Sequence, residues 1–523
     1  MLPTPSARTG LREHALALWR QADRVFDAAF GSALNPLRHL GSLGFLCFWL
    51  LALSGIYLYV VIDTSADGAW RSIEQLAHQP WYVGGWLRSL HRYAADAFVI
   101  LMGLHLLREW LHGRYRGFRR FSWWTGVPLI VFAFVSAIGG FWLNWDQLGQ
   151  FSAQATAEWF DALPLLATPL ARNFLTADAV NDRLFSLFVF VHLGVPLLMV
   201  FGLWFHIQRI TRAAVFPPRA LALGSLAVLM ALAGVVPVTI HAAANVAVVP
   251  TALALDWVLL FVHPLAAATS GGVLWLLVAG SLLLLIALPM LPQPARPAVA
   301  VVDPGNCNGC RRCFEDCPYA AVTMVPHPIR RVGKELAVVD PDLCASCGIC
   351  AGACPSSTPF RSAAELVTGI DMPQLPVGVL RQRLREGLAS SPSAQRIVVF
   401  GCDHGAPVQR LAGDDLVPIS LICSGMLPPS FVEYALRDGA AGVLVNGCCE
   451  GACEFRQGQQ WAAQRLAGQR EPHLRASVPA DRLAVAWTDA ADTPALDRAL
   501  NALRQRLEAA PPDRGAALTT EPA

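Results

Sequence analysis

The chain has 523 residues, of which 54% are hydrophobic and only 15% charged, and its formal net charge is +2. This length allows several domains, and so few charges in so long a chain indicate membrane-spanning segments joined to a soluble portion. The net charge by itself says nothing about nucleic acid, and no nucleic-acid partner is expected; the local placement of charge is more informative.

Residues 1–40 are expected to form a cytoplasmic amphipathic segment. Within it, residues 11–30 mix arginine, aspartate and apolar residues at helical spacing, which is typical of a surface helix rather than of a secretory signal. Beyond it, 41–292 is predicted to be an all-α membrane domain of six spanning helices. The apolar runs that predict these helices are 43–62, 87–110, 127–145, 184–210, 221–238 and 272–291.

Arginines mark one side of these predicted helices. Five precede the first run. Five lie at the end of the second run or between it and the third, and three lie at the end of the fourth run or between it and the fifth, whereas the first-to-second loop has one. The positive-inside rule then places the N-terminus in the cytoplasm, and six spans return the chain there. A multi-pass protein of a bacterial inner membrane with both termini cytoplasmic is therefore expected.

Two of the apolar runs each carry a pair of histidines fourteen residues apart, His91 with His105 and His192 with His206. At ~1.5 Å per residue and ~3.6 residues per turn, such a pair lies on one helix face, about 21 Å apart. Two such helices side by side can hold two haems by both axial positions. A lone histidine in an apolar helix is more often a hydrogen-bonded core residue, but polar residues in lipid are costly and usually functional. The repeated spacing favours haem ligands.

The same fourteen-residue step recurs in glycines, Gly41 with Gly55 and Gly126 with Gly140. Glycine weakens a helix, and its use is to let a flat group approach the backbone closely. Close packing of helices is the alternative explanation. Together with the histidines, the matching steps predict two haem-sized slots.

Several segments, in order, resemble cytochrome b of the quinol-oxidising bc and bf complexes: GSLGFLCFWLLALSG, GGWLRSLH, GLHLLR, GGFWLNWDQLGQFSA and FVFVHLGVP. The resemblance implies that His91 and His192 hold one haem b, of low potential, near the periplasmic face. It implies that His105 and His206 hold a second haem b, of high potential, near the cytoplasmic face.

This resemblance implies further contacts. Arg88 and Arg108 match positions that pair with haem propionates, a partnership that bidentate geometry favours. LDWVLLFVHPLAA falls where the family carries a Pro-Glu-Trp-Tyr motif lining the periplasmic quinol site; Asp256 and Trp257 fit it, whereas leucine and valine replace the proline and tyrosine. Asp256 would accept the proton of an oxidised quinol, assisted by His263 one heptad on, on the same helical face. A degenerate site that binds no quinone remains an alternative.

Thirteen of the fourteen cysteines follow residue 300 in tight clusters, which indicates metal ligation in a reducing compartment rather than disulfides. In 293–360 the run C-x₂-C-x₂-C-x₃-C-P occurs twice, and the fourth cysteine of each run ligates the other cluster. This part resembles a bacterial 2[4Fe–4S] ferredoxin of α+β fold; zinc is the less suitable alternative. The two predicted [4Fe–4S] ligand sets are Cys307, Cys310, Cys313 and Cys354, and Cys344, Cys347, Cys350 and Cys317.

Residues 396–510 are predicted to form a small parallel α/β domain, after a linker at 361–395 and before a disordered tail at 511–523. RIVVFGC, LVPISLIC, AGVLVNGC and RLAVAWT are the expected strands, with helices in PPSFVEYALRDGA and FRQGQQWAAQRL. Three strands end in cysteines, and ligands gather at the carboxyl ends of parallel strands. A metal centre is therefore expected, with scattered core cysteines as the alternative. Its ligands would be Cys402, Cys423, Cys448 and Cys453.

ICSGM, DGAAGVLVNGC and GC-x₄-C resemble the delta subunit of methyl-viologen-reducing hydrogenase. The resemblance implies that these four cysteines hold a [2Fe–2S] cluster and that electrons pass to a heterodisulfide-reductase-type flavoprotein. CDHGA lacks a second cysteine often found in that family, and Cys449 is additional. Whether Cys448 or Cys449 is the ligand therefore stays open.

Every expected cofactor moves single electrons. The chain is thus predicted to be the membrane subunit of a quinone-linked oxidoreductase complex. It would relay electrons between quinone and a cytoplasmic flavin or iron–sulfur partner linked to NAD(P)H, formate, hydrogen or a heterodisulfide. The alternatives are a bc-type quinol-oxidising cytochrome b with a Rieske partner, and a membrane anchor without its own quinone site. The direction of electron flow, the side on which quinone reacts and a dimer of complexes stay open.

Overall fold

The computed structural model describes residues 10–79, 82–163, 169–170, 179–210, 213–248, 252–292, 297–329, 332–362 and 365–509. It divides into an N-terminal unit, made of residues up to 208 and 213–293, and a C-terminal unit, made of 209–212 and 294–523. The expected disordered tail at 511–523 lies outside the described residues.

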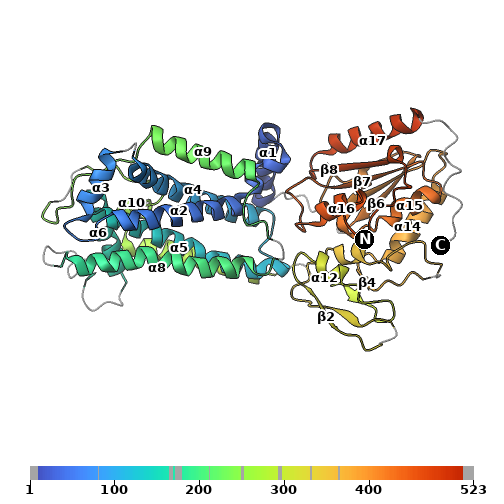
Figure 1. Cartoon of the computed structure of the whole chain (residues 1–523), viewed down its shortest axis with the longest axis horizontal. Helices are drawn as coiled ribbons and strands as arrows, with labels where there is room; N and C mark the ends of the chain where they lie inside the picture. Colours follow the sequence, from blue (N-terminus) through green and yellow to red (C-terminus); the bar gives the residue numbers. More distant parts are fainter. Residues whose placement is uncertain are drawn as a thin grey trace. The chain divides into compact units, whose positions relative to one another are not determined.

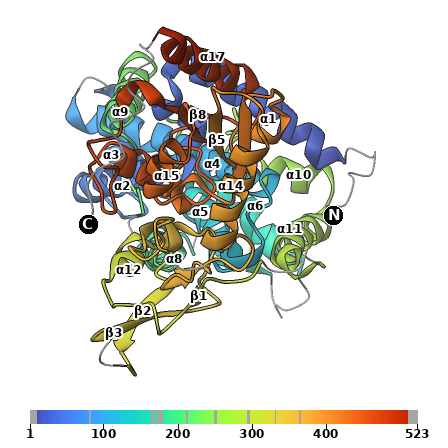
Figure 2. The ribbon, with the colours of Figure 1, turned by 90° about the vertical axis from the view of Figure 1, so that its right-hand side faces the viewer.

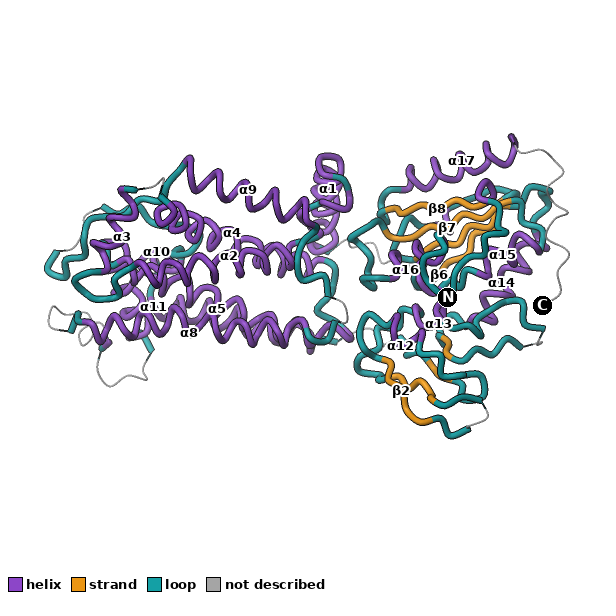
Figure 3. The backbone as a smooth tube through the Cα atoms, viewed as in Figure 1, coloured by secondary structure: helices purple, strands orange, loops and turns teal. Residues whose placement is uncertain are grey.

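The N-terminal unit is built of helices (Figures 1 and 3). Its centre consists of four long helices in two pairs, in which α2 packs along α4 and α5 packs along α8. The helices are α1 (Leu11–Phe30), α2 (Leu40–Val61), α3 (Ala69–His78), α4 (Val83–Leu111), α5 (Arg120–Asn144), α6 (Gln147–Asp161), α8 (Asp182–Ile207), α9 (Arg219–Val235), α10 (Val262–Ala268) and α11 (Gly271–Ala287).

Four of the described helical segments are long and apolar enough to cross a membrane: Leu40–Val61, Gly117–Asn144, Asp182–Ile207 and Gly271–Met290. The chain is therefore a multi-pass membrane protein. Each of the six predicted spans coincides with a helix, but two fall outside this group. Helix α9 has 17 residues, and the 29-residue α4 carries Arg92 and Asp96 near its middle.

The first part of the C-terminal unit, up to β4, is a small mixed α/β region. Strands β2 (Val322–Pro326) and β3 (Glu335–Val339) form an antiparallel ladder that lies beside α12 (Figure 2). Strand β1 (Val301–Val302) pairs with β4 (Ile370–Asp371), also antiparallel. The short helices α12 (Arg312–Asp316) and α13 (Ile349–Ala353) each lie within one of the cysteine runs, just before its fourth cysteine, and they pack on each other.

The second part is a four-stranded sheet in the order β6-β5-β7-β8, with every pair parallel. All four predicted strands are present, as β5 (Ile397–Cys402), β6 (Leu416–Leu421), β7 (Gly442–Cys448) and β8 (Leu483–Thr488). The two predicted helices are α15 (Ser430–Arg437) and α16 (Gly458–Leu466), and the structure adds α14 (Val377–Ser390) and α17 (Thr493–Ala509).

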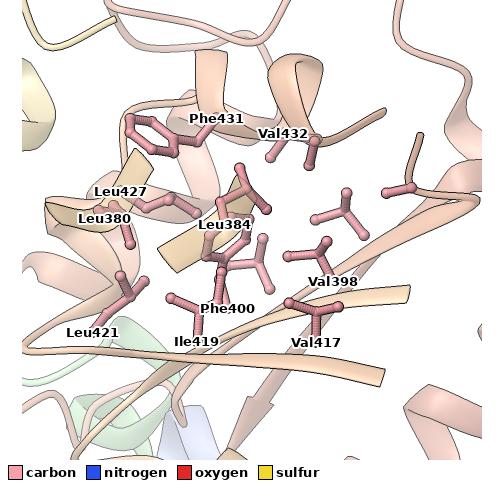
Figure 4. Packing of buried hydrophobic residues seen from close by; sticks show 14 of the residues in the cluster. Leu380, Leu384, Val398, Phe400, Val417, Ile419, Leu421, Leu427, Phe431 and Val432 are labelled. Carbon is pink, nitrogen blue, oxygen red and sulfur yellow. The ribbon is translucent and has the colours of Figure 1, made fainter. Parts of the chain in front are cut away.

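Successive side chains along each strand point to opposite faces of the sheet, and both faces are buried. Val398 and Phe400 of β5 point into a core with Leu384 of α14 and Phe431 of α15 (Figure 4). The intervening residues of β5 pack instead against α17, around Leu500. A sheet covered by helices on both faces explains why its strands are nearly continuous apolar runs.

One expectation differs from the structure. The stretch 361–395, predicted as a linker, contains β4 and the 14-residue helix α14. Leu380, Leu384 and Leu388 recur at helical spacing and are fully or almost fully buried against the sheet. Helix α14 is therefore an integral layer of the α/β domain, whereas β4 pairs with β1 of the preceding region.

Candidate functional site

The four predicted haem-ligating histidines meet in two pairs, each joining α4 to α8. The ring centroids of His91 and His192 are 6.3 Å apart, and those of His105 and His206 are 6.5 Å apart. A metal–imidazole nitrogen bond is about 2 Å and the ring centroid lies about 1 Å behind that nitrogen, so two imidazoles on opposite sides of one iron would have centroids roughly 6 Å apart. Both pairs fit a haem iron held between them.

The four glycines with the same spacing each contact one of these histidines. A Cβ atom added at Gly41 would lie 3.4 Å from Cε1 of His105, and one at Gly55 would lie 3.1 Å from Cε1 of His91. On α5, an added Cβ atom at Gly126 would lie 3.1 Å from Cε1 of His206, and one at Gly140 would lie 2.9 Å from Cε1 of His192. Helices α2 and α5 thus come close to the imidazoles because these positions lack a side chain.

Three histidines have their Nδ1 atom engaged by a neighbouring helix. His91 Nδ1 lies 2.9 Å from the Ser54 hydroxyl oxygen, and His192 Nδ1 lies 2.8 Å from the Ser136 carbonyl oxygen. His206 Nδ1 lies 3.2 Å from the Thr125 hydroxyl oxygen. Such contacts fix the ring orientation and leave Nε2 for a metal. The sequence analysis missed Ser54 and Thr125, although each directly precedes a spaced glycine.

An apolar layer separates the two histidine pairs. Phe48, Phe98, Ala133 and Met199 are buried together in one cluster. Each lies midway, seven residues from either member, between the two spaced glycines or histidines of its helix. The Phe48 and Phe98 ring centroids are 6.4 Å apart. Closely packed apolar side chains therefore separate the two histidine pairs.

A cavity of about 170 Å³ adjoins the first pair and is lined by His91, His192, Arg88 and Arg92, among others. Arg88 donates hydrogen bonds to the carbonyl oxygens of Val238 (2.6 Å) and Thr239 (3.0 Å). This buried guanidinium beside the histidines suits a propionate carboxylate.

At the other end of α4, Arg108 is also buried, and its guanidinium lies 3.6 Å from the Glu109 carboxylate. It stands one helical turn after His105. The structure therefore places both predicted propionate partners near their histidines.

The predicted quinone residues do not form one cluster. Asp256 is ion-paired with Arg92, and its carboxylate accepts a 2.7 Å hydrogen bond from the Leu259 backbone. Trp257 is 69% exposed, whereas His263 is 2% exposed and lies 3.0 Å from the Ser152 hydroxyl. The expected shared helical face is wrong because α10 begins only at Val262, so Asp256 lies in the preceding loop.

The first cysteine set surrounds a small cavity, which Cys307, Cys310, Cys313 and Cys354 all line. Burial raises the pKa of Cys313 to about 12, and the neighbouring thiols of Cys310, Cys354 and Cys307 add to this effect. Cys310 is exposed, so this site has one edge toward solvent.

The second set lies deeper. Burial raises the pKa of Cys350, and the thiols of Cys347, Cys317 and Cys344 reinforce the shift. Burial and mutual repulsion disfavour the thiolate form of closely spaced cysteines. Coordination to cationic iron would compensate for both effects and favour the thiolates. The grouping follows the predicted exchange of the fourth cysteine between the two runs.

The third set converges at the carboxyl ends of β5 and β7. Cys402 Sγ lies 3.8 Å from Cys448 Sγ. Cys402 is also a neighbour of the Cys423 thiol, and Cys448 is a neighbour of the Cys453 thiol. Hydrogen bonds from Cys423 and Cys448 hold the pKa of Cys402 and of Cys453 below the ordinary value. The four predicted ligands therefore form a closed group, and Cys449 lies buried beside it.

Among the residues that the structure describes, no group of three or more His, Cys, Asp or Glu side chains is arranged to hold a single metal ion.

Three parts of the chain match known families. Residues 25–214 match cytochrome b/b6/petB, residues 306–358 match the 4Fe-4S dicluster domain, and residues 397–510 match the delta subunit of methyl-viologen-reducing hydrogenase. Among solved structures, a chain titled "Hyperthermophilic respiratory Complex III" is 18% identical, with a TM-score of 0.42, and the match covers 54% of this chain and 83% of that one.

The three resemblances seen in the sequence are thereby confirmed. The cytochrome b family implies haem b, and the dicluster domain with its cysteine runs implies two [4Fe–4S] clusters.

Proposed function

We propose that this chain, which joins a cytochrome b domain to a 4Fe–4S dicluster domain and a hydrogenase delta-subunit domain, is the membrane electron-transfer subunit of a quinone-linked oxidoreductase. It relays electrons between a cytoplasmic flavin or iron–sulfur partner and membrane quinone. Bound haem and iron–sulfur clusters supply one-electron exchange, and the protein holds them in place.

One observation carries this proposal: facing histidine pairs at 6.3 and 6.5 Å occur in the same chain as three closed groups of cysteines. We assign haem b to His91 with His192 and to His105 with His206. We assign [4Fe–4S] clusters to the two dicluster sets, and a [2Fe–2S] cluster to Cys402, Cys423, Cys448 and Cys453.

The burial of the cysteines supports an order within the C-terminal unit. Cys347 of the second set shares an apolar cluster with Cys423 and Cys453 of the two-iron set. The first set adjoins the second through the paired helices α12 and α13, and it alone has an exposed cysteine among the dicluster ligands. The second set is therefore the inner link of the three.

The proposed quinone site lies at Asp256. Asp256 lies next to the first histidine pair through Arg92, which favours proton exchange there. The same ion pair occupies the carboxylate, and this favours the alternative of an anchor without its own quinone chemistry. Asp256→Asn tells them apart. Slowed quinone turnover with intact haem reduction supports a site at Asp256, whereas unchanged turnover favours the anchor or a site on the cytoplasmic side.

The function itself is tested on the purified complex with its native partners. We expect two haems b per chain, iron–sulfur signals of both kinds, and quinone reduction or quinol oxidation that requires a flavin or another two-electron subunit. A complex that reduces quinone from NAD(P)H without any such subunit would contradict the proposal.

A further inference from the structure

A buried ion pair links the dicluster region to the α/β domain. Arg465 of α16 is fully buried, and its guanidinium pairs with Asp316, which is 4% exposed and lies between Cys313 and Cys317. Arg470 pairs with the other carboxylate oxygen of Asp316.

The same guanidinium also binds the loop of the two-iron site. Arg465 Nη1 donates a 2.8 Å hydrogen bond to the carbonyl oxygen of Gly425, two residues after Cys423. The Arg465 guanidinium thus binds the Asp316 carboxylate of the dicluster region and the Gly425 carbonyl of the two-iron site at once. The forked geometry of arginine allows this.

Glycines let the two regions come together at this point. A Cβ atom at Gly352 would lie 2.3 Å from the Gly425 carbonyl oxygen. One at Gly458 would lie 2.2 Å from Cys423 Sγ and 3.5 Å from a methyl group of Ile349. Ile349 stands between Cys347 and Cys350, so the loop of the second dicluster set packs directly on the two-iron site.

Two features of Arg465 are not explained by its ion pair with Asp316 alone. Its Nε–H is buried and has no hydrogen-bond acceptor among the residues that the structure describes. Its charge also lies close enough to Cys423 for the two groups to interact electrostatically. A buried positive charge beside a cluster, and N–H groups directed at its sulfurs, favour the reduced state.

We propose that Arg465 is a positioning residue that holds the loop of Cys423 against the segment of Asp316 and Cys317, a predicted ligand of the second dicluster set, and thereby couples the two sites electronically. This inference rests on the proposed function, because it requires clusters at both sites. One electron passes between the sites, with no bond made and no proton moved.

The test uses the complete complex reduced until both clusters are paramagnetic. In the wild type, the two-iron electron paramagnetic resonance signal is expected to be split by the neighbouring four-iron cluster. Arg465→Met is expected to abolish the splitting and to lower the two-iron midpoint potential. The variant can fold because Asp316 keeps Arg470 as a partner. Arg465→Lys retains the charge without the fork, so the splitting is lost while the midpoint stays near the wild-type value.

The matched control is Arg504→Met. Arg504 forms two 2.9 Å hydrogen bonds to Asp415, which precedes the amino end of β6, the strand whose carboxyl end leads to Cys423. This variant is expected to keep both the splitting and the midpoint. Unchanged splitting in both Arg465 variants, with wild-type cluster content, would overturn the inference alone. A wild-type complex without a two-iron signal would overturn the proposed function as well.

Discussion

Each histidine pair is contacted by two glycines, one from α2 and one from α5. A Cβ atom at Gly140 would lie 2.9 Å from Cε1 of His192, closer than real contacts allow, so Gly140→Val must displace the imidazole. We expect this variant to lose one of the two haems b while the other remains, as measured by haem content per chain and by the visible spectrum. Gly194→Val is the control, because a Cβ atom there meets nothing within 4 Å. Equal haem content in the two variants would contradict the assignment.

In the proposed function, the Ser54 hydroxyl adjusts the ligand strength of His91 and is not itself a metal ligand. It donates to the Leu50 carbonyl (2.6 Å), so it can accept the Nδ1–H of His91 at 2.9 Å. Such a partner makes the imidazole a more basic ligand, and its loss typically weakens metal binding roughly tenfold to a hundredfold. Ser54→Ala should therefore raise the midpoint potential of that haem in a redox titration.

Ser42→Ala serves as the control for this titration, because Ser42 of the same helix donates to the backbone of His39. An identical midpoint potential in Ser54→Ala and the wild type would show that the Ser54 hydroxyl does not influence this haem.

At this scale the sequence predicts ligands better than their supporting groups. The paired histidines, glycines and cysteines were visible because their spacing repeats along the chain. Ser54 and Thr125 were not, because their hydroxyls acquire a role only when another helix brings a histidine against them. Asp256 and His263 were predicted to share a face on the assumption of a continuous helix, whereas the helix begins between them.

Helix α14 is a structural layer whose removal should unfold the domain around it. Leu384 is fully buried between this helix and the sheet, so Leu384→Ala leaves a cavity that should cost about 2–5 kcal/mol. Val379 on the same helix is 37% exposed, and Val379→Ala should cost less than about 1 kcal/mol. Chemical denaturation of the full chain, followed by the loss of iron–sulfur absorbance, measures both. Similar costs would mean that α14 is not packed as described.

The elements that the sequence predicted correctly are those with strong apolar runs, such as β5 and β7. Helix α14 was missed although Leu380, Leu384 and Leu388 follow helical spacing, because proline- and serine-rich stretches on either side resemble a linker. The membrane helices show the reverse error. Six apolar runs were counted alike, but length and charge set α4 and α9 apart. The local sequence pattern thus predicts that a helix forms more reliably than it predicts whether that helix lies in a membrane, in a soluble core or in a linker.

For the whole molecule, the proposed relay predicts that one inner cysteine controls haem reduction from the cytoplasmic side. Cys350 is buried among the thiols of the second dicluster set, so Cys350→Ala should remove that cluster while the histidine pairs stay intact. In the complete complex, we expect the cytoplasmic electron donor to reduce the haems far more slowly than in the wild type. Quinol should still reduce them, because that route does not pass through the cysteines.

Cys47→Ala is the matched control for this experiment. Cys47 is equally buried, but it packs with Phe48 and Phe98 in the apolar layer, so its loss should leave both reduction routes unchanged. The comparison also separates the competing functions. A bc-type quinol oxidase would show quinol-driven haem reduction that is indifferent to Cys350, with no donor-driven route even in the wild type. Donor-driven reduction at the wild-type rate in a Cys350→Ala complex that lacks the second cluster would refute the relay, because electrons would then bypass its inner link.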